Sequence, residues 1–405
     1  MSQPAVTVAA PYPEEGAVQL ARAAEQAGRL DRLLMPSRAG SRALSRAAEL
    51  LGRGDAARRL RRGAGDVRAL QEVAPLFEPL RLVASLPGVG GLAPDIHRLK
   101  AGFDRRVAQV PFASPAIVCM PEAALATFDR RPDVLRVFHE VDGHPRARNE
   151  VLTDTYGARR AASEAHPQQI VDRIEAELAL ADLILSPSSA VTAQMTAQGV
   201  PEAKLLQAHL GVDLAAFAAV EEAPAATSGN TEPVLLYVGQ ISLRKGITFL
   251  IDAARGARVQ VRLLGPVVDR SLLEGAPENV RYLGTASHAG VADAMRRADA
   301  FVFPTLEDAF GLVVVEAAAS GLPVISTVGA GASEVLGAED VLQVPIADSR
   351  ALGEAMAATE PLARDERRDR AARIRAAAAG GSIHDWAGWS AAVLRGIDAA
   401  LAARP

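Results

Sequence analysis

The sequence predicts an α/β protein built from two parallel-sheet domains, and three observations lead to this prediction. Short apolar runs alternate with longer amphipathic runs, which is the pattern of buried parallel strands joined by helices. The alternation stops after Asp213 and restarts at Val234, so each half of the chain carries it once. A length of 405 residues, at about 100–200 residues per domain, also fits two domains.

In the first half, six short runs are apolar on both faces, as strands covered by helices on both sides must be. Helices are expected between them: in residues 168–182 the apolar side chains recur at helical spacing and form one stripe. The predicted strands are 6–10, 32–35, 116–120, 134–138, 183–185 and 206–209.

The second half follows residues 220–233, an acidic run rich in Pro, Ala, Ser, Thr and Gly that is typical of a linker. An apolar stripe over 383–397 predicts a C-terminal helix that packs on another part of the protein. We therefore expect domains at 1–215 and 216–380, and a helix within 381–405 that packs back toward the first domain. The predicted strands are 234–239, 259–265, 280–284, 300–305 and 323–328, and the predicted helices are 245–256, 288–298 and 310–321.

The composition excludes several classes of protein. Aromatic residues at 4% and a net charge of −4 argue against a protein that binds nucleic acid over its whole surface. No apolar run reaches about 18 residues and the N-terminus lacks a basic start, so we expect neither a membrane span nor an export signal. The single cysteine, Cys119, cannot form an internal disulfide, which favours a reducing compartment and a cytoplasmic protein.

Residues 237–246, YVGQISLRKG, join a strand to a helix through a short basic turn. Gly239 permits a tight turn after the strand, and Arg244 and Lys245 stand directly before Gly246 at the start of the helix. Two cations beside the free N–H groups of a helix start make a site for an anion such as a phosphate. A solvated Arg-Lys pair that only opens a helix is the other interpretation.

Residues 305–323, TLEDAFGLVVVEAAASGLP, hold acids on either side of a predicted helix start. Asp308 is expected in the loop before the helix, and Glu316 about a turn and a half inside it. A carboxylate among Val and Ala side chains is costly to bury unless it accepts hydrogen bonds, and the hydroxyls of a sugar or ribose are suitable donors. An acid favoured by the helix dipole, with Glu316 on an exposed face, is the alternative.

Together these motifs resemble the retaining glycosyltransferases of family 4. The spacing acid-x2-Gly-Leu-x3-Glu-Ala at 308–317 is similar to the donor signature of that family, and Gly-x4-Arg-Lys-Gly at 239–246 to its diphosphate loop. The ordered residues of 177–217 resemble its crossover between domains, and 328–334 its glycine-bearing loop that closes over the donor. The resemblance runs from about residue 130 to about residue 355.

The resemblance implies the GT-B architecture, in which two Rossmann-like domains face each other across the active cleft. It implies transfer of a hexose from a nucleotide diphosphate sugar, with retention, without a metal and with no cofactor besides that co-substrate. The second domain would bind the donor. The first would present the acceptor hydroxyl of a small molecule, a lipid-linked precursor or a polysaccharide precursor.

The resemblance also implies roles for residues of this sequence. Lys245 and Arg244 would neutralise the departing diphosphate, because developing charge is stabilised by cations already in place. Glu316 would bind the ribose hydroxyls, and Asp308 the hydroxyls of the donor sugar. The donor-binding set is completed by Gly239, Gln240 and the N–H groups of Phe310, Gly311 and Leu312.

A histidine and two departures from the family pattern concern the same site. The family places an active-site histidine after the fourth predicted strand, where His144 fits best by position and His139 is the alternative.

This sequence departs from the family pattern at two positions. The family usually carries Arg directly after the loop glycine, where this sequence has Gln240, and it usually carries Glu at the position of Asp308. Arg244 would partly compensate for the missing cation, although both changes put donor preference and activity in doubt.

Three other functions stay open. The two departures suit a catalytically weak sugar-nucleotide-binding protein or partner subunit. Residues 88–93 loosely match a dinucleotide fingerprint of an epimerase or dehydrogenase, although Pro94 interrupts any following helix. From Arg42 to Arg62, seven arginines accompany two acids, so this stretch would either contact an anionic membrane surface or be a solvated face. The seven histidines show no metal-ligand spacing.

Overall fold

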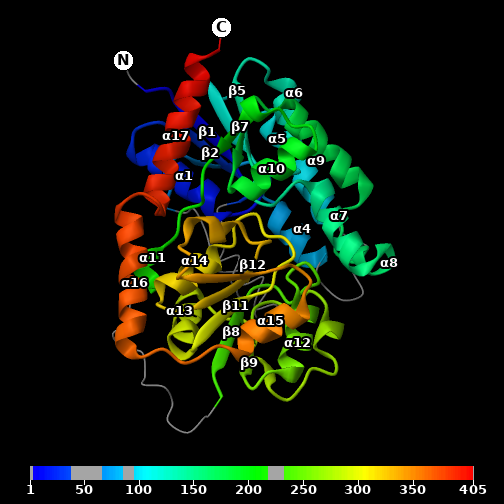
Figure 1. Ribbon diagram of the computed structural model, residues 1–405. Coiled ribbons are helices and arrows are strands. Elements are labelled where there is room, and N and C mark those ends of the chain that lie inside the picture. The colour runs from blue at the N-terminus through cyan, green and yellow to red at the C-terminus, as the bar shows by residue number, and fades with distance from the viewer. Residues whose placement is uncertain (1–2, 38–65, 85–94, 218–231, 405) are drawn as a thin grey trace.

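The computed structural model describes residues 3–37, 66–84, 95–217 and 232–404 and contains two parallel β-sheets, one above the other in Figure 1. The sheet of the first half has the order β3-β2-β1-β4-β5-β6-β7, and that of the second half β10-β9-β8-β11-β12-β13. All registered strand pairs are parallel. The predicted fold class of two parallel-sheet α/β domains is confirmed.

The first sheet is apolar on both faces except at its edges, because helices cover both of its sides. Its edge strand β3 reads Leu-Gln-Glu and was not predicted, since three residues of mixed polarity give no apolar run. The strands are β1 (Val6–Ala9), β2 (Leu30–Met35), β3 (Leu70–Glu72), β4 (Ala116–Cys119), β5 (Leu135–His139), β6 (Leu183–Ser186) and β7 (Leu205–Gln207). The helices are α1 (Glu15–Gln26), α4 (Phe77–Ala84), α5 (Ile96–Val107), α6 (Leu125–Arg130), α7 (Pro145–Tyr156), α8 (Ala158–Ala161), α9 (Gln168–Leu180) and α10 (Ser189–Ala197).

The second sheet follows the predicted alternation and adds one strand at its edge. That strand, β13, was missed because its two central residues are exposed and only its ends are buried. The strands are β8 (Val234–Val238), β9 (Gln260–Leu264), β10 (Val280–Tyr282), β11 (Ala300–Phe303), β12 (Val324–Thr327) and β13 (Val341–Val344). The helices are α11 (Leu214–Phe217), α12 (Ile247–Gly256), α13 (His288–Arg297), α14 (Leu312–Ala319), α15 (Ser349–Ala357), α16 (Arg364–Ala379) and α17 (Trp386–Ala402).

The chain crosses between the two domains twice, first near Val212 and again near His384. These two crossings are in contact with each other. Val212 N–H donates to the carbonyl of His384 over 3.0 Å. A Cβ on Gly211 would lie 2.5 Å from the Cα of Trp386, so a residue without a side chain is needed there. Helix α17 then packs on α1, β5 and β6 of the first domain, as the adjoining red and blue helices of Figure 1 show.

The strand order of each sheet contains a point at which the direction of the connections changes. In each sheet the first strand along the chain, β1 or β8, lies inside the sheet, and the strands that follow it are added on both of its sides. Ligands of such sheets bind beyond the carboxyl ends of the strands at this switch point.

Among the described helices, none is long and apolar enough to cross a membrane. The basic stretch 42–62, the run 88–93 and most of the linker 220–233 lie outside the described residues.

Candidate functional site

A cavity of about 400 Å³ lies between the two domains, at the carboxyl ends of β8 and β11. The second domain supplies most of its wall, and Glu14, Val141 and Leu210 come from the first half of the chain. It gathers many of the residues predicted to bind the donor. These are Gly239, Lys245, Asp308, Phe310, Gly311, Leu312 and Glu316.

Lys245 and Asp308 form an ion pair inside this cavity. The Lys245 ammonium donates to the Asp308 carboxylate and lies 5.6 Å from the centre of the Phe303 ring. Burial lowers the pKa of Lys245, and the negative charge of Asp308 opposes that effect. Lys245 is held in place by Gly246, which has φ of 67° and whose Cβ, if present, would lie 1.9 Å from the Pro304 carbonyl oxygen. Lys245 thus lies on the cavity wall and is paired with Asp308, which lines the same wall.

Arg244 does not line the cavity, and its buried guanidinium is paired with two carboxylates. Its Nη1 lies 3.2 Å from Glu307 Oε2 and 3.8 Å from Asp142 Oδ1. Burial lowers the pKa of Arg244, but the charges of Asp142, Glu307 and Asp308 outweigh this effect and raise it. Glu307 is only 3% exposed, and burial raises its pKa. The two adjacent cations therefore have different surroundings, with Lys245 on the cavity wall and Arg244 behind it.

The start of α14 opens onto the cavity. Gly311 is its N-cap with φ of 85°, and no side chain caps the helix there. The N–H of Phe310 donates to Asp308 Oδ1 over 3.3 Å, so Asp308 already engages one of the three N–H groups predicted for the donor. Unpaired N–H groups at a helix start attract the oxygens of a phosphate or sugar.

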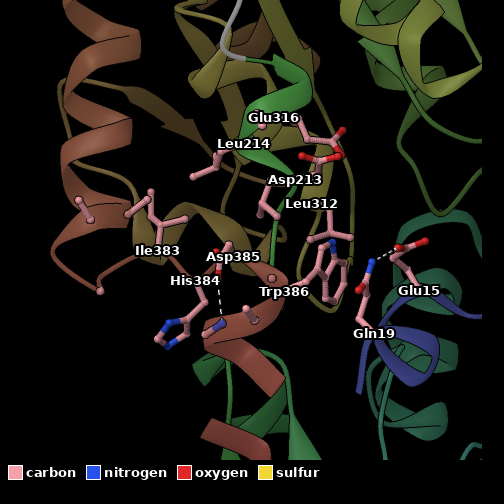
Figure 2. A pocket seen from close by; sticks show the side chains of 18 of the residues that line it. Glu15, Gln19, Asp213, Leu214, Leu312, Glu316, Ile383, His384, Asp385 and Trp386 are labelled. Atoms are coloured by element: carbon pink, nitrogen blue, oxygen red, sulfur yellow. Dashed lines mark hydrogen bonds between the residues drawn. The ribbon is translucent and has the colours of Figure 1, made fainter. Parts of the chain in front are cut away.

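Glu316 lies on α14 and lines both this cavity and a larger one of about 970 Å³ beside it (Figure 2). It is half-buried, and within the described residues its carboxylate receives no hydrogen bond. Burial, with a smaller contribution from the charge of Asp213, raises the pKa of Glu316 to about 7. An apolar helix thus presents a carboxylate that lacks donors, which agrees with the expectation of a partly buried acid.

Neither candidate histidine ring lines the cavity, but the two are placed differently. His144 is the N-cap of α7, and its Nδ1 accepts from Arg146 N–H over 3.3 Å. His139 Nε2 lies 3.3 Å from Glu14 Oε2, and Glu14 is on the cavity wall. The His139 ring also lies beside Trp389, with 5.4 Å between the ring centres. His139 is therefore the histidine connected to the cavity through a hydrogen bond, while the role of either stays a prediction.

Gln240, which replaces the usual arginine, has an exposed side chain. Its carbonyl accepts from the Tyr237 hydroxyl over 2.7 Å, which fixes the backbone of the turn.

The loop 328–334, predicted to close over the donor, contacts the first domain. Glu334 accepts from Ser189 N–H over 3.0 Å and lies 2.7 Å from His209 Nε2.

Sequence reasoning missed the first-domain residues that hold the basic turn. The Glu164 carboxylate accepts from the N–H groups of Leu243 and Arg244 at 2.6 and 3.0 Å. The Tyr156 hydroxyl lies 3.0 Å from the Leu243 carbonyl, to which it donates, and 2.9 Å from Thr248 Oγ1. These partners are about eighty residues apart in the chain and carry no motif, so a single sequence offers no signal for them.

Residues 232–359 match the family described as glycosyl transferases group 1. The second domain is a group 1 glycosyltransferase domain. Both motifs that carried the resemblance, 239–246 and 308–317, lie inside the match, and the recognition is confirmed.

Several curated proteins align to part of this chain. A GDP-mannose-dependent alpha-mannosyltransferase of Mycobacterium tuberculosis is 31% identical over 160 residues, which are 39% of this chain and 42% of that protein. A phosphatidyl-myo-inositol mannosyltransferase of Mycobacterium leprae is 35% identical over 162 residues, or 38% and 42%. The chain thus spans less than half the length of these curated relatives.

The solved structure of HepE from Anabaena, in complex with UDP and glucose, is similar over nearly the whole chain. The TM-score is 0.63 with 15% identity, and the match covers 97% of this chain and 99% of that one. At this identity the likeness concerns the fold alone, and the fold is the GT-B arrangement of two facing domains.

Proposed function

We propose that the protein transfers a hexose from a nucleotide diphosphate sugar to an acceptor hydroxyl, with retention and without a metal. The observation that carries the proposal is the Lys245–Asp308 pair in a cavity between two domains, with Glu316 on the same wall. Lys245 and the helix start suit the diphosphate, Asp308 suits the hydroxyls of the sugar, and Glu316 suits those of the ribose.

The donor would exchange partners with this ion pair. Its diphosphate takes the place of Asp308 beside Lys245, and the released Asp308 carboxylate accepts hydrogen bonds from the sugar hydroxyls. Lys245 then stabilises the charge that develops on the diphosphate as it leaves. Arg244, held by Glu307 and Asp142, supports the same turn from behind and adds positive potential without touching the ligand.

The transfer itself needs few protein groups once both substrates are held. The acceptor oxygen bonds to the anomeric carbon as the bond from that carbon to the phosphate oxygen breaks, on the same face of the sugar. The acceptor proton passes to the departing diphosphate, so the products are a glycoside and a nucleoside diphosphate. Glu14 and its partner His139 stand on the first-domain side, where the acceptor would enter. Closure of the domains excludes water, which would otherwise hydrolyse the donor.

The relatives support a nucleotide sugar as the donor without fixing which one. One is named for GDP-mannose, and HepE was solved with UDP and glucose. These names leave the base and sugar used by this chain open.

A panel of UDP-, GDP-, ADP- and dTDP-sugars, read by melting temperature, tests the proposal. Saturation at 100 times the Kd adds about 2.7 kcal/mol to the free energy of unfolding, which is easily measured. We expect one donor class to raise the melting temperature of the wild type and to lose that effect in Lys245→Ala. Lys204→Ala is the control, because Lys204 contacts the Ala179 carbonyl outside the cavity.

The matching donor is then incubated with candidate acceptors, with and without EDTA, and the anomeric configuration of the product is read by NMR. Retention and an unchanged rate in EDTA are expected. Equal binding of the donor by wild type and Lys245→Ala would remove the basis of the proposal, as would a panel in which no nucleotide sugar binds.

A further inference from the structure

The larger cavity, of about 970 Å³, lies where the two chain crossings meet (Figure 2). His288, Leu312 and Glu316 line it and the donor cavity alike, so the two spaces share a wall. Its other sides come from Asp213, in the first crossing, and Trp386, at the start of α17. A donor whose diphosphate lies at Lys245 and whose ribose reaches Glu316 therefore arrives at the edge of this second space.

Asp213 lies beside Glu316, and its second carboxylate oxygen faces His288 beyond hydrogen-bond distance. Its Oδ1 caps α11 by accepting from Ala216 N–H over 3.3 Å, and its Oδ2 lies 3.9 Å from His288 Nε2. Figure 2 draws the carboxylates of Asp213 and Glu316 beside each other, and the charge of Asp213 acts directly on Glu316. The side chain of Asp213 is 53% exposed, so a ligand can reach it.

We propose that Asp213 and Glu316 together bind the two ribose hydroxyls of the donor, one each, and so select ribonucleoside over deoxyribonucleoside diphosphates. This inference rests on the proposed function and adds to it a second carboxylate and a substrate class.

The chemistry of a vicinal diol fits two neighbouring carboxylates. Each hydroxyl donates one hydrogen bond, and an ionised carboxylate only accepts. A neutral diol between the two negative groups supplies both with donors and adds no further charge. Because Asp213 belongs to a crossing between the domains, binding of the ribose also fixes that crossing against the second domain.

The test measures the affinity of UDP and GDP, and of their 2′-deoxy and 3′-deoxy analogues, by calorimetry. In the wild type, for whichever base binds, each missing hydroxyl should weaken binding by about 10-fold to 100-fold, the usual range for a hydrogen bond to a charged group. In Asp213→Ser one of the two penalties should disappear and the other persist. In Glu316→Gln, whose amide oxygen still accepts a hydrogen bond, the other penalty should shrink and the first persist.

The variants are chosen to separate binding from folding. Ser is a good N-cap, so Asp213→Ser keeps a hydroxyl oxygen for the start of α11 while it removes the carboxylate and its charge. Asp348→Ser is the matched control, since Asp348 caps α15 through Ala351 N–H at 2.8 Å and lines neither cavity. A conservative variant, Asp213→Asn, should fall between wild type and Asp213→Ser.

Two results would overturn the inference and are distinguishable from each other. If the wild type binds a nucleoside diphosphate but Asp213→Ser keeps both penalties, the role of Asp213 is wrong while the proposed function stands. If the wild type binds no nucleoside diphosphate, both fail together.

Discussion

Glu316 is a residue whose surroundings favour its neutral form. It lies on an apolar helix, faces Asp213 and has no hydrogen-bond donor among the described residues, and its pKa is raised to about 7. A carboxyl whose pKa is higher in the folded state than in the unfolded chain destabilises the fold wherever it must ionise. The penalty is absent below the ordinary pKa of 4.5, grows between 4.5 and about 7, and is complete above that.

Replacing Glu316 with Gln should therefore stabilise the ligand-free protein in a pH-dependent manner. At pH 8 we expect a gain on the order of 2 kcal/mol in the free energy of unfolding, and at pH 4.5 a gain near zero. Denaturant titrations of both proteins at the two pH values measure this. Glu354→Gln is the control, because Glu354 is exposed and pairs with Arg350 on α15. A gain of equal size at both pH values would contradict the mechanism.

Single residues differ in how far the sequence predicts them. Lys245, Asp308 and Glu316 were found because each stands at a fixed spacing from a glycine that starts a helix, and the cavity contains all three. Arg244 is the neighbour of Lys245 in sequence, yet its side chain leaves the turn in another direction and meets Glu307. Side-chain direction at a turn depends on tertiary contacts, and a motif does not encode it.

The start of α12 depends on one glycine. Gly246 adopts φ of 67°, and its Cα faces the Pro304 carbonyl in the segment after β11. This close approach brings the turn that carries Lys245 against the segment that carries Asp308. A side chain here would force the two motifs apart.

Gly246→Ala should destabilise the second domain by more than about 2 kcal/mol, because left-handed backbone strain adds to the clash with Pro304. Urea titration of each variant measures this loss as a decrease in the free energy of unfolding. Gly256→Ala is the matched control at the other end of α12, where a Cβ meets nothing within 4 Å. That variant should be neutral or slightly stabilising. Equal stability of the two variants would show that the approach to Pro304 imposes no constraint.

Strands and helices were predicted correctly where their apolar pattern in the sequence was strong. The central strands of both sheets were predicted because they are apolar on both faces, and α14 because its start is marked by Gly311. The edge strands β3 and β13 were missed, since an edge strand is short and partly exposed and so has no distinctive periodicity.

At the scale of the whole molecule, several side-chain contacts join the two domains besides the chain crossings. Glu164 holds the turn before α12, Tyr156 contacts Thr248 on α12, and Glu334 reaches back to α10. The first two act directly on the segment that carries Lys245. The first domain therefore orders the proposed diphosphate site even though it contributes little to the cavity wall. The sequence predicted two facing domains but not these contacts, since they join residues far apart in the chain.

Removing Glu164 should loosen the diphosphate turn without unfolding either domain. In Glu164→Ala the N–H groups of Leu243 and Arg244 lose a charged acceptor at 2.6 and 3.0 Å, so their hydrogen exchange should accelerate about tenfold. The apparent affinity for the donor should fall in parallel, because its site is ordered for a smaller fraction of the time. Glu150→Ala is the control, since Glu150 bonds Gln198 within the first domain. Unchanged exchange at Leu243 together with weaker donor binding would mean that Glu164 acts on the ligand and not through the turn.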